Sequence, residues 1–302
     1  MEKIGNDYHI PVLYYETLDN LVINPDGIYI DCTLGGGSHS EGILERLSDK
    51  GLLISKRLEK FGSKWKVFKG NFENIDTIAY TAGVDKVDGI LMDIGVSSKQ
   101  LDDPKRGFSY RYDVKLDMRM NTDQKISAYD IVNTYTEEQL SKIIFEYGEE
   151  RHARKIAKLI VEERKSSPIE KTSDLITLIK RAYPERASKH PAKKTFQAIR
   201  IEVNRELEVL GNAISKAAEL LKVGGRLAII TFHSLEDRIV KNKFKDLATA
   251  CKCPKDIPIC VCGGVKKFEI ITKKPIIPID DELKNNNRAH SSKLRILERI
   301  LD

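Results

Sequence analysis

A cluster of glycines follows the first strongly apolar run of the chain. The run ends at Thr33, and Leu34-Gly35-Gly36-Gly37-Ser38-His39 and helix-forming sequence come next, an order that predicts a strand, a tight turn and a helix start. Since glycine has no Cβ, this turn can adopt positive φ and let a ligand approach backbone amides at the helix N-terminus. The turn lacks both the G-x-G-x-x-G fingerprint and the lysine of a P-loop, which favours an adenosine-bearing ligand without a triphosphate. An ordinary strand-to-helix connection is the alternative.

Polar residues end two further apolar runs. The run 87–94 contains Asp93, and the run 226–232 is followed by His233. Both runs have the pattern of buried parallel strands and alternate with helical segments, which predicts an α/β fold with an open, doubly wound sheet. Such sheets bind ligands at the carboxyl ends of their strands. We therefore expect His39, Asp93 and His233 at one edge of the sheet.

The middle of the chain, residues 103–198, has no strand-like run. Apolar residues recur at helical spacing in 137–165 and 172–183, and Pro191 suits the first turn of a third helix that continues towards Lys222. This pattern predicts a helical insertion. Residues 151–200 contain 14 Lys and Arg against 5 Asp and Glu, an excess that suits a phosphate backbone. A solvated helical face is the alternative.

The composition argues against a membrane protein. The 302 residues are 41% hydrophobic and 32% charged with a net charge of +6, and no stretch is apolar enough to span a bilayer. Residues 1–10 lack the apolar core of a signal peptide. We therefore expect a cytoplasmic protein with no membrane partner, long enough for one large domain or two smaller ones.

Several ordered strings match one known family. Besides the glycine turn they are HIPVL at 9–13, DIGVSSKQLD at 93–102, RGFSY at 106–110, LDMRM at 116–120, YGEER at 147–151, HPAKKTFQAIRI at 190–201 and TFHSLEDR at 231–238. On these strings the chain resembles, over nearly its whole length, the RsmH (MraW) family of bacterial methyltransferases, which use S-adenosylmethionine to methylate N4 of a cytidine in 16S ribosomal RNA. The resemblance implies a Rossmann-like S-adenosylmethionine-dependent methyltransferase sheet, residues 1–110 and 196–302, with an inserted all-helical domain, residues 111–195, that binds the RNA of the small ribosomal subunit.

The resemblance also implies a set of cofactor-binding residues. They are Gly37, Ser38, His39, Phe72, Asp93 and Gln100. The amides of the turn would face the methionine carboxylate, Phe72 would stack beside adenine, and Asp93 would accept hydrogen bonds from the cofactor or the substrate amine. Phe72 fits a core aromatic equally well, whereas Asp93, at the end of a buried strand, must find partners or solvent.

The implied reaction depends mainly on alignment. The lone pair of cytosine N4 is delocalised into the ring, so the amine must be held in line with the sulfonium methyl and needs a hydrogen-bond acceptor. In amino-methyltransferases the loop after the fourth strand supplies this acceptor, which predicts Asp93 with Ser97 or Ser98 as catalytic residues, although the paired prolines and the aromatic of that motif are missing. The target base must leave its stack to reach them. Candidates for holding the base or its phosphate are Arg106, Phe108, Asp117, Arg119 and His233; a lone histidine such as the last is more often structural.

One part of the family pattern is missing from this chain. The family has an acidic cluster and much of a helix between a strand like 52–54 and a segment like 55–59, and no acidic residue stands here about 20 residues after the glycine turn to bind ribose hydroxyls. Only residues 55–64 separate this strand from the next, whereas a parallel crossover needs about 10 to 12 residues or more. Either a segment is absent from this sequence, or the chain is a variant with a weakened ribose site, to which Glu59 is the nearest acid.

Two other functions therefore stay open. The missing segment fits a catalytically impaired RNA-binding or ribosome-assembly protein on the same fold. A DNA or protein amino-methyltransferase fits the glycine turn and the fourth strand but not the other strings. The oligomeric state is not predicted.

Four cysteines lie in a C-x-C…C-x-C pattern at 251, 253, 260 and 262. Four thiolates can hold zinc, but the usual spacing within each pair is C-x₂₋₄-C. We therefore predict reduced cysteines in a cytosolic loop, and no metal site, for Cys251, Cys253, Cys260 and Cys262.

Overall fold

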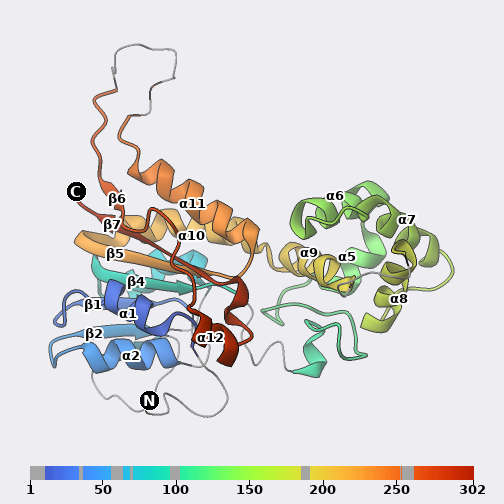
Figure 1. Ribbon diagram of the computed structural model, residues 1–302, viewed down its shortest axis with the longest axis horizontal. Helices are drawn as coiled ribbons and strands as arrows, with labels where there is room; N and C mark the ends of the chain where they lie inside the picture. The colour runs from blue at the N-terminus through green and yellow to red at the C-terminus, as the bar shows by residue number, and fades with distance from the viewer. Residues whose placement is uncertain are drawn as a thin grey trace. The chain divides into compact units, whose positions relative to one another are not determined.

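The computed structural model describes residues 11–33, 37–55, 64–68, 71–95, 103–184, 191–251, 253 and 262–302. The chain forms two compact units (Figure 1): a sheet unit, Met1–Gly95 with Leu207–Asp302, and a helical unit, Val96–Glu206. The helical unit is longer at both ends than the predicted insertion 111–195. The reason is that Phe108, before the predicted insertion, and Phe196, Ile199 and Val203, after it, pack in the helical core.

The sheet unit contains a seven-stranded sheet of order β3-β2-β1-β4-β5-β7-β6. Its strands are β1 (Ile28–Asp31), β2 (Leu52–Ser55), β3 (Trp65–Val67), β4 (Val87–Asp93), β5 (Leu221–Thr231), β6 (Phe268–Ile270) and β7 (Lys293–Arg299). The first five in this order are parallel, and β7 is antiparallel to both of its neighbours. The strand order reverses between β1 and β4, which makes this the switch point where open α/β sheets bind ligands. The predicted doubly wound α/β fold is confirmed.

Both faces of the sheet are apolar, because successive residues of a strand point to opposite sides. In β4, Ile90 and Met92 pack in one core and Leu91 packs in the other, and Ile229 and Ile230 of β5 divide in the same way. The first core includes residues of α3 (Ile75–Thr81), α10 (Glu206–Leu220) and α11 (Ser234–Ala248), and the second includes residues of α1 (Tyr14–Leu21), α2 (Ser38–Arg46), α12 (Asp280–Asn285) and η4 (Ala289–Ser291). Buried parallel strands thus explain the long apolar runs of the sequence.

The helical unit has a core of its own. Its elements are η3 (Pro104–Arg106), α5 (Ala128–Thr134), α6 (Glu137–Gly148), α7 (Ala153–Glu163), α8 (Thr172–Ala182) and α9 (Ala192–Asn204). Two predictions of helix length are wrong. The helix expected over 137–165 is broken at Glu149, and the helix expected from Pro191 towards Lys222 is broken at Arg205 and ends at Leu220, because Glu149 and Arg205 adopt left-handed conformations with φ of 48° and 50°.

The link between β2 and β3 is short. The two strands are parallel neighbours, with Leu53 beside Trp65 and Ser55 beside Val67. Residues 56–63, which include Glu59, lie outside the described residues. The chain therefore joins a parallel pair with fewer residues than a crossover commonly uses.

Candidate active site

The glycine turn delivers a helix N-terminus to the carboxyl edge of the sheet. Gly37 caps α2 in the left-handed conformation, with φ of 87°, which favours glycine over any residue with a Cβ. Ser38 and His39 are buried in the first turn of the helix. The amides of a first helical turn have no partner within the helix and attract anionic groups. Gly35 and Gly36 lie outside the part of the chain that the structure describes.

Asp31, a buried carboxylate, ends β1. It is not among the site residues predicted from the sequence. Asp31 Oδ2 accepts a hydrogen bond from Ser40 Oγ at 2.5 Å, and Oδ1 accepts one from the backbone amide of Thr33 at 3.0 Å. The Ser40 hydroxyl also lies 3.3 Å from the hydroxyl of Ser55, the last residue of β2. These contacts join the ends of two strands to the first turn of α2. The available signal was an acidic residue closing an apolar run, as at Asp93.

A pocket opens at the same edge. Its lining residues are Ile30, Asp31, Cys32, Ile54, Ser55, Phe68, Phe72, Ile75 and Ile78. Phe72 begins η2 (Phe72–Asn74) and is half-buried against the sheet core. An apolar pocket with a single carboxylate and a hydroxyl suits an aromatic ring that carries polar substituents.

Asp93 ends β4 beside the switch point. Its backbone amide donates to Thr33 Oγ1 at 2.7 Å, and its Oδ2 lies 3.7 Å from His39 Nδ1. His39 Nε2 lies 3.1 Å from the carbonyl oxygen of Val12, to which it can donate, and the other ring nitrogen, Nδ1, faces Asp93. Asp93 Oδ1 is buried and has no hydrogen-bond partner among the described residues.

The environment of Asp93 disfavours its charge. Burial, followed by the nearby carboxylates of Asp31 and Glu236, raises the pKa of Asp93 to about 7. A carboxyl group with this pKa is ionised in a large fraction of molecules near neutrality and remains poorly solvated. Asp93 can therefore accept a hydrogen bond strongly from a ligand that reaches it.

His233 has a structural role at the start of α11. It is the N-cap residue: its Nδ1 accepts from the backbone amide of Glu236 at 3.4 Å, and its Nε2 lies 3.0 Å from Glu236 Oε1. The fully buried Glu236 accepts in return from the amides of Phe232 and His233. This reciprocal capping box uses His233 Nδ1 and Glu236 Oε2, whereas His233 Nε2 and Glu236 Oε1 are buried with no hydrogen-bond partner among the described residues. A direct role of His233 towards substrate stays a prediction.

The other candidate substrate residues contact one another within the helical unit. The Arg119 guanidinium forms two hydrogen bonds of 2.8 Å with the Asp117 carboxylate, and its Nη1 donates to two backbone carbonyls. This pairing lowers the pKa of Asp117. Arg106 donates to the carbonyl of Arg119 at 2.6 Å and lies over the ring of Phe108, which is buried in the helical core. These contacts shape the loop between η3 and α5.

Loss of the Asp117 carboxylate should therefore affect folding first. We expect Asp117→Ala to lower the free energy of unfolding by about 1.5–3 kcal/mol, because the Arg119 guanidinium loses its charged partner. Urea denaturation measures this change. Asp113→Ala is the control: Asp113 is exposed, accepts a hydrogen bond from Ser173 and pairs with Lys171, so its loss should change the free energy of unfolding much less. Unchanged stability with lost activity towards RNA would instead assign Asp117 to substrate binding.

Three candidate residues, Ser97, Ser98 and Gln100, lie outside the described residues, which resume at Asp103. Their assignments as catalytic or cofactor-binding residues stay predictions.

Two helix N-termini of the helical unit are basic. Arg154 and Lys155 occupy the first turn of α7, Lys193 and Lys194 occupy the first turn of α9, and all four are exposed. The two helix starts are close, because Lys194 Nζ donates to the carbonyl of Glu149, just before α7, at 2.7 Å. Cations at a helix N-terminus oppose the helix dipole, a cost of about 0.3–1 kcal/mol each that a bound anion removes. Within the described residues, Arg154, Lys155 and Lys193 make no ion pair.

The chain is similar to proteins named for ribosomal RNA methylation. Ribosomal RNA small subunit methyltransferase H of Fusobacterium nucleatum subsp. nucleatum is 93% identical over 314 aligned positions that cover all of both chains. The proteins of that name from Clostridioides difficile and Caldicellulosiruptor bescii are 52% and 50% identical over 97% of this chain and 99% of their own. A solved rRNA methylase from Streptococcus thermophilus aligns with 95% of this chain and 94% of its own at 12% identity and a TM-score of 0.36.

The alignment with the Fusobacterium protein is longer than this chain. It spans 314 positions against 302 residues here, so at least twelve positions of that relative have no counterpart in this chain. The model of the MraW methylase family matches residues 6–300. This chain belongs to the MraW methylase family and is a methyltransferase.

Proposed function

We propose that this protein transfers a methyl group from S-adenosylmethionine to N4 of a cytidine in the 16S ribosomal RNA of the small subunit. The observation that carries the proposal is the Asp93 carboxyl, which lies at the switch point with a raised pKa and a buried Oδ1 that has no partner among the described residues. The family match favours an enzyme over the catalytically impaired RNA-binding protein considered above. The names of the relatives favour RNA over DNA or protein as substrate.

The sheet unit supplies the cofactor site of this proposal. The first turn of α2, with Gly37, Ser38 and His39, offers amides to the methionine carboxylate, and Phe72 offers its ring to adenine. S-adenosylmethionine carries a sulfonium and an ammonium, and Asp31 and Asp93 place two carboxylates at the same edge to attract them. In the described residues Asp31 is the carboxylate that lines the pocket.

Asp93 then acts on the substrate amine. Its carboxylate accepts a hydrogen bond from N4, which fixes the amine in line with the methyl group. This hydrogen bond also shifts electron density from the N–H bond towards the nitrogen, so that its lone pair is more available. Ser97 or Ser98 would share this task, and Gln100 would contact the cofactor, as the family resemblance implies. The methyl carbon would form its bond to N4 as its bond to sulfur breaks, S-adenosylhomocysteine would leave, and the proton of N4 would pass to the Asp93 carboxylate and then to solvent, with no covalent intermediate.

The helical unit supplies most of the proposed RNA contacts. The basic starts of α7 and α9 would hold phosphates that flank the target. Arg106, Phe108, Asp117 and Arg119 of this unit, and His233 of the sheet unit, would shape or contact the path of the unstacked base. No helix in the described residues combines the length and the apolar character needed to span a bilayer. We place the reaction in the cytoplasm, where ribosomal subunits mature.

Methyl transfer tests this function directly. The purified chain is incubated with S-adenosylmethionine labelled in its methyl group and with small ribosomal subunits from cells that lack this modification. We expect label in 16S RNA, at N4 of one cytidine as identified by nucleoside mass spectrometry. Label in DNA or protein instead, or none in RNA under conditions where the cofactor binds, would contradict the proposal.

Asp31 should contribute to cofactor affinity. We expect Asp31→Asn to weaken S-adenosylmethionine binding by about 10- to 100-fold, because a charge-assisted contact contributes about 1.5–3 kcal/mol. Calorimetric titration measures the dissociation constant. The control is Asp88→Asn: Asp88 lies at the start of β4 and pairs with Lys222, away from the carboxyl edge. Equal losses in both variants would show a general effect of stability and not a cofactor contact.

A further inference from the structure

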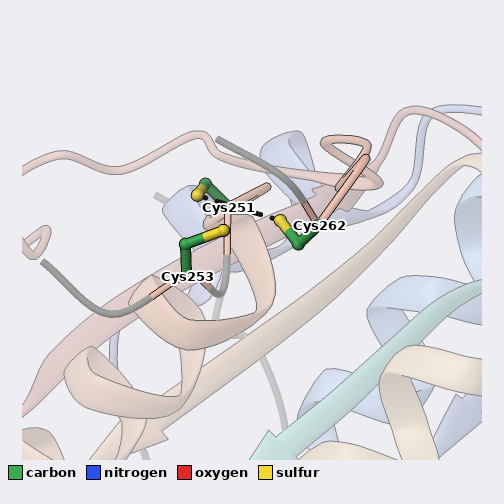
Figure 2. Close-up of side chains that lie close together, drawn as sticks. All are labelled: Cys251, Cys253 and Cys262. Atoms are coloured by element: carbon green, nitrogen blue, oxygen red, sulfur yellow. Dashed lines mark hydrogen bonds between the residues drawn. The ribbon is translucent and has the colours of Figure 1, made fainter. Parts of the chain in front are cut away.

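Three cysteine side chains lie close together in the segment that follows α11. Cys251 and Cys253 come just after the helix, and Cys262 lies on the return of the chain towards β6. Figure 2 shows their sulfur atoms facing one another, and all three Sγ atoms lie within 4.8 Å of each other. The C-x-C spacing, which argued against a metal site in the sequence, therefore does not keep these thiols apart.

The separation of two of the sulfurs matches a shared metal ion. Cys251 Sγ and Cys262 Sγ are 3.8 Å apart. Two thiolates bound to one tetrahedral zinc at about 2.3 Å each lie about 3.8 Å from one another. A disulfide would need about 2.05 Å. The separation, at which the two thiols form a hydrogen bond here, is also the separation that two zinc-bound thiolates adopt.

The backbone is built for this close approach. Gly263, directly after Cys262, has φ of 57°. A Cβ on Gly264 would lie 1.9 Å from the carbonyl oxygen of Ala250, so only glycine lets the returning chain lie this close to the residue before Cys251. Gly263 and Gly264 therefore allow the chain at Cys262 to lie close to the chain at Cys251.

The donor atoms indicate the class of metal. All the donors are sulfur, a set that selects a soft or borderline ion.

We propose that Cys251, Cys253 and Cys262 are ligands of a structural zinc ion. The proposal differs from the sequence-based prediction of no metal site at these cysteines. Zinc takes four ligands, so the three thiols leave one position for another donor. Cys260 lies outside the described residues. α11 begins beside the candidate active site and is 15 residues, or about 22 Å, long, so an ion at its far end serves the segment between α11 and β6 and not the methyl transfer. Its effect is to tie the two ends of that segment together.

Metal analysis of the whole chain tests the proposal. The protein is purified under reducing conditions, supplied with zinc, and dialysed against metal-free buffer before elemental analysis. We expect about one zinc per chain, and loss of that zinc in both Cys251→Ser and Cys262→Ser. Cobalt replaces zinc as a spectroscopic probe and should give the thiolate charge-transfer and tetrahedral ligand-field bands in the unaltered chain only. Circular dichroism confirms that each variant is folded.

Two further variants separate ligation from other effects. Cys32→Ala removes a buried thiol of the sheet unit and should retain the zinc. Gly264→Ala keeps every cysteine but moves the chain at Cys262 away from the chain at Cys251. It should weaken zinc binding at least 10-fold in competition with a chelator. Zinc content below one-tenth per chain after reconstitution, zinc retained by folded Cys251→Ser, or a Cys251–Cys262 disulfide in place of the metal would overturn the proposal.

Discussion

Replacing Asp93 by asparagine should slow methyl transfer by about 10²–10⁴-fold. Asparagine keeps the size of the side chain and removes the anionic acceptor that the substrate amine needs, so the loss falls on the chemical step. Single-turnover rates at saturating S-adenosylmethionine and RNA isolate that step. We expect cofactor affinity to fall much less than the rate, since the α2 amides and the pocket around Phe72 remain. A variant that retains more than one-tenth of the rate would remove Asp93 from the reaction.

The pH dependence of the rate should report the Asp93 carboxyl. The pKa of Asp93 is about 7 without ligands, and the ionised form is the acceptor, so the single-turnover rate should rise with pH and level off above the pKa that Asp93 has with cofactor bound. Asp93→Asn should show no step in that range. Bound S-adenosylmethionine is cationic and shifts the step to lower pH, because a nearby positive charge favours the carboxylate. A flat profile of the unaltered enzyme between pH 5 and 8 would contradict this assignment.

The free energy of unfolding should also depend on the Asp93 carboxyl, but it should fall as the pH rises, whereas the rate increases. The pKa of Asp93 rises from 3.8 to about 7 on folding, so between these values the folded chain binds a proton that the unfolded chain has released. The favourable contribution is complete below about pH 4 and is lost as the pH rises through 7. Relative to Asp93→Asn, the unaltered chain should therefore lose up to about 4 kcal/mol of unfolding free energy between pH 4 and 8. Urea denaturation at both pH values, without cofactor, measures the difference.

The fold could be predicted from sequence because its parallel strands are buried on both faces. Such strands leave uninterrupted apolar runs, and the residue that ends a run, as Asp93 does, must lie at the sheet edge where ligands bind. The glycine turn could also be predicted, since Gly37 needs a positive φ. The helix lengths could not be predicted, because Glu149 and Arg205 adopt left-handed conformations although neither is a glycine, and their residue types do not indicate a helix end.

The site could be predicted only in part, because partners are set by the fold. Asp31 lies in the same apolar run as the glycine turn, but its importance depends on Ser40 and Ser55 meeting it from two other elements. Asp117 and Arg119 have the residue types of a substrate site, yet their pairing with each other becomes evident only in three dimensions. Charge and residue type indicate where chemistry is available; the contacts decide which groups are already used.

The basic starts of α7 and α9 should dominate RNA affinity. We expect the triple variant Arg154→Gln, Lys155→Gln, Lys193→Gln to lower the salt dependence of RNA binding, the slope of log K against log salt, by about 2 to 3. Affinity for small-subunit RNA should fall by about 10-fold or more at low salt, since each lost phosphate contact no longer releases its counterions. Binding isotherms at several salt concentrations provide both quantities, and unchanged affinity for S-adenosylmethionine shows that the sheet unit is intact.

A matched triple variant separates position from charge. Lys142, Lys165 and Lys180 are exposed cations of the same helical unit, outside the first turns of the helices, and they make no ion pair among the described residues. Replacing all three by glutamine changes the net charge by the same amount. Lys165 and Lys180 follow or occupy the last turns of α7 and α8, where a cation already complements the helix dipole and no anion is needed. We expect this variant to keep most of the RNA affinity and slope. Equal losses in the two triples would mean that RNA responds to the overall charge of the unit, and that the paired helix starts are solvated faces and not a binding site.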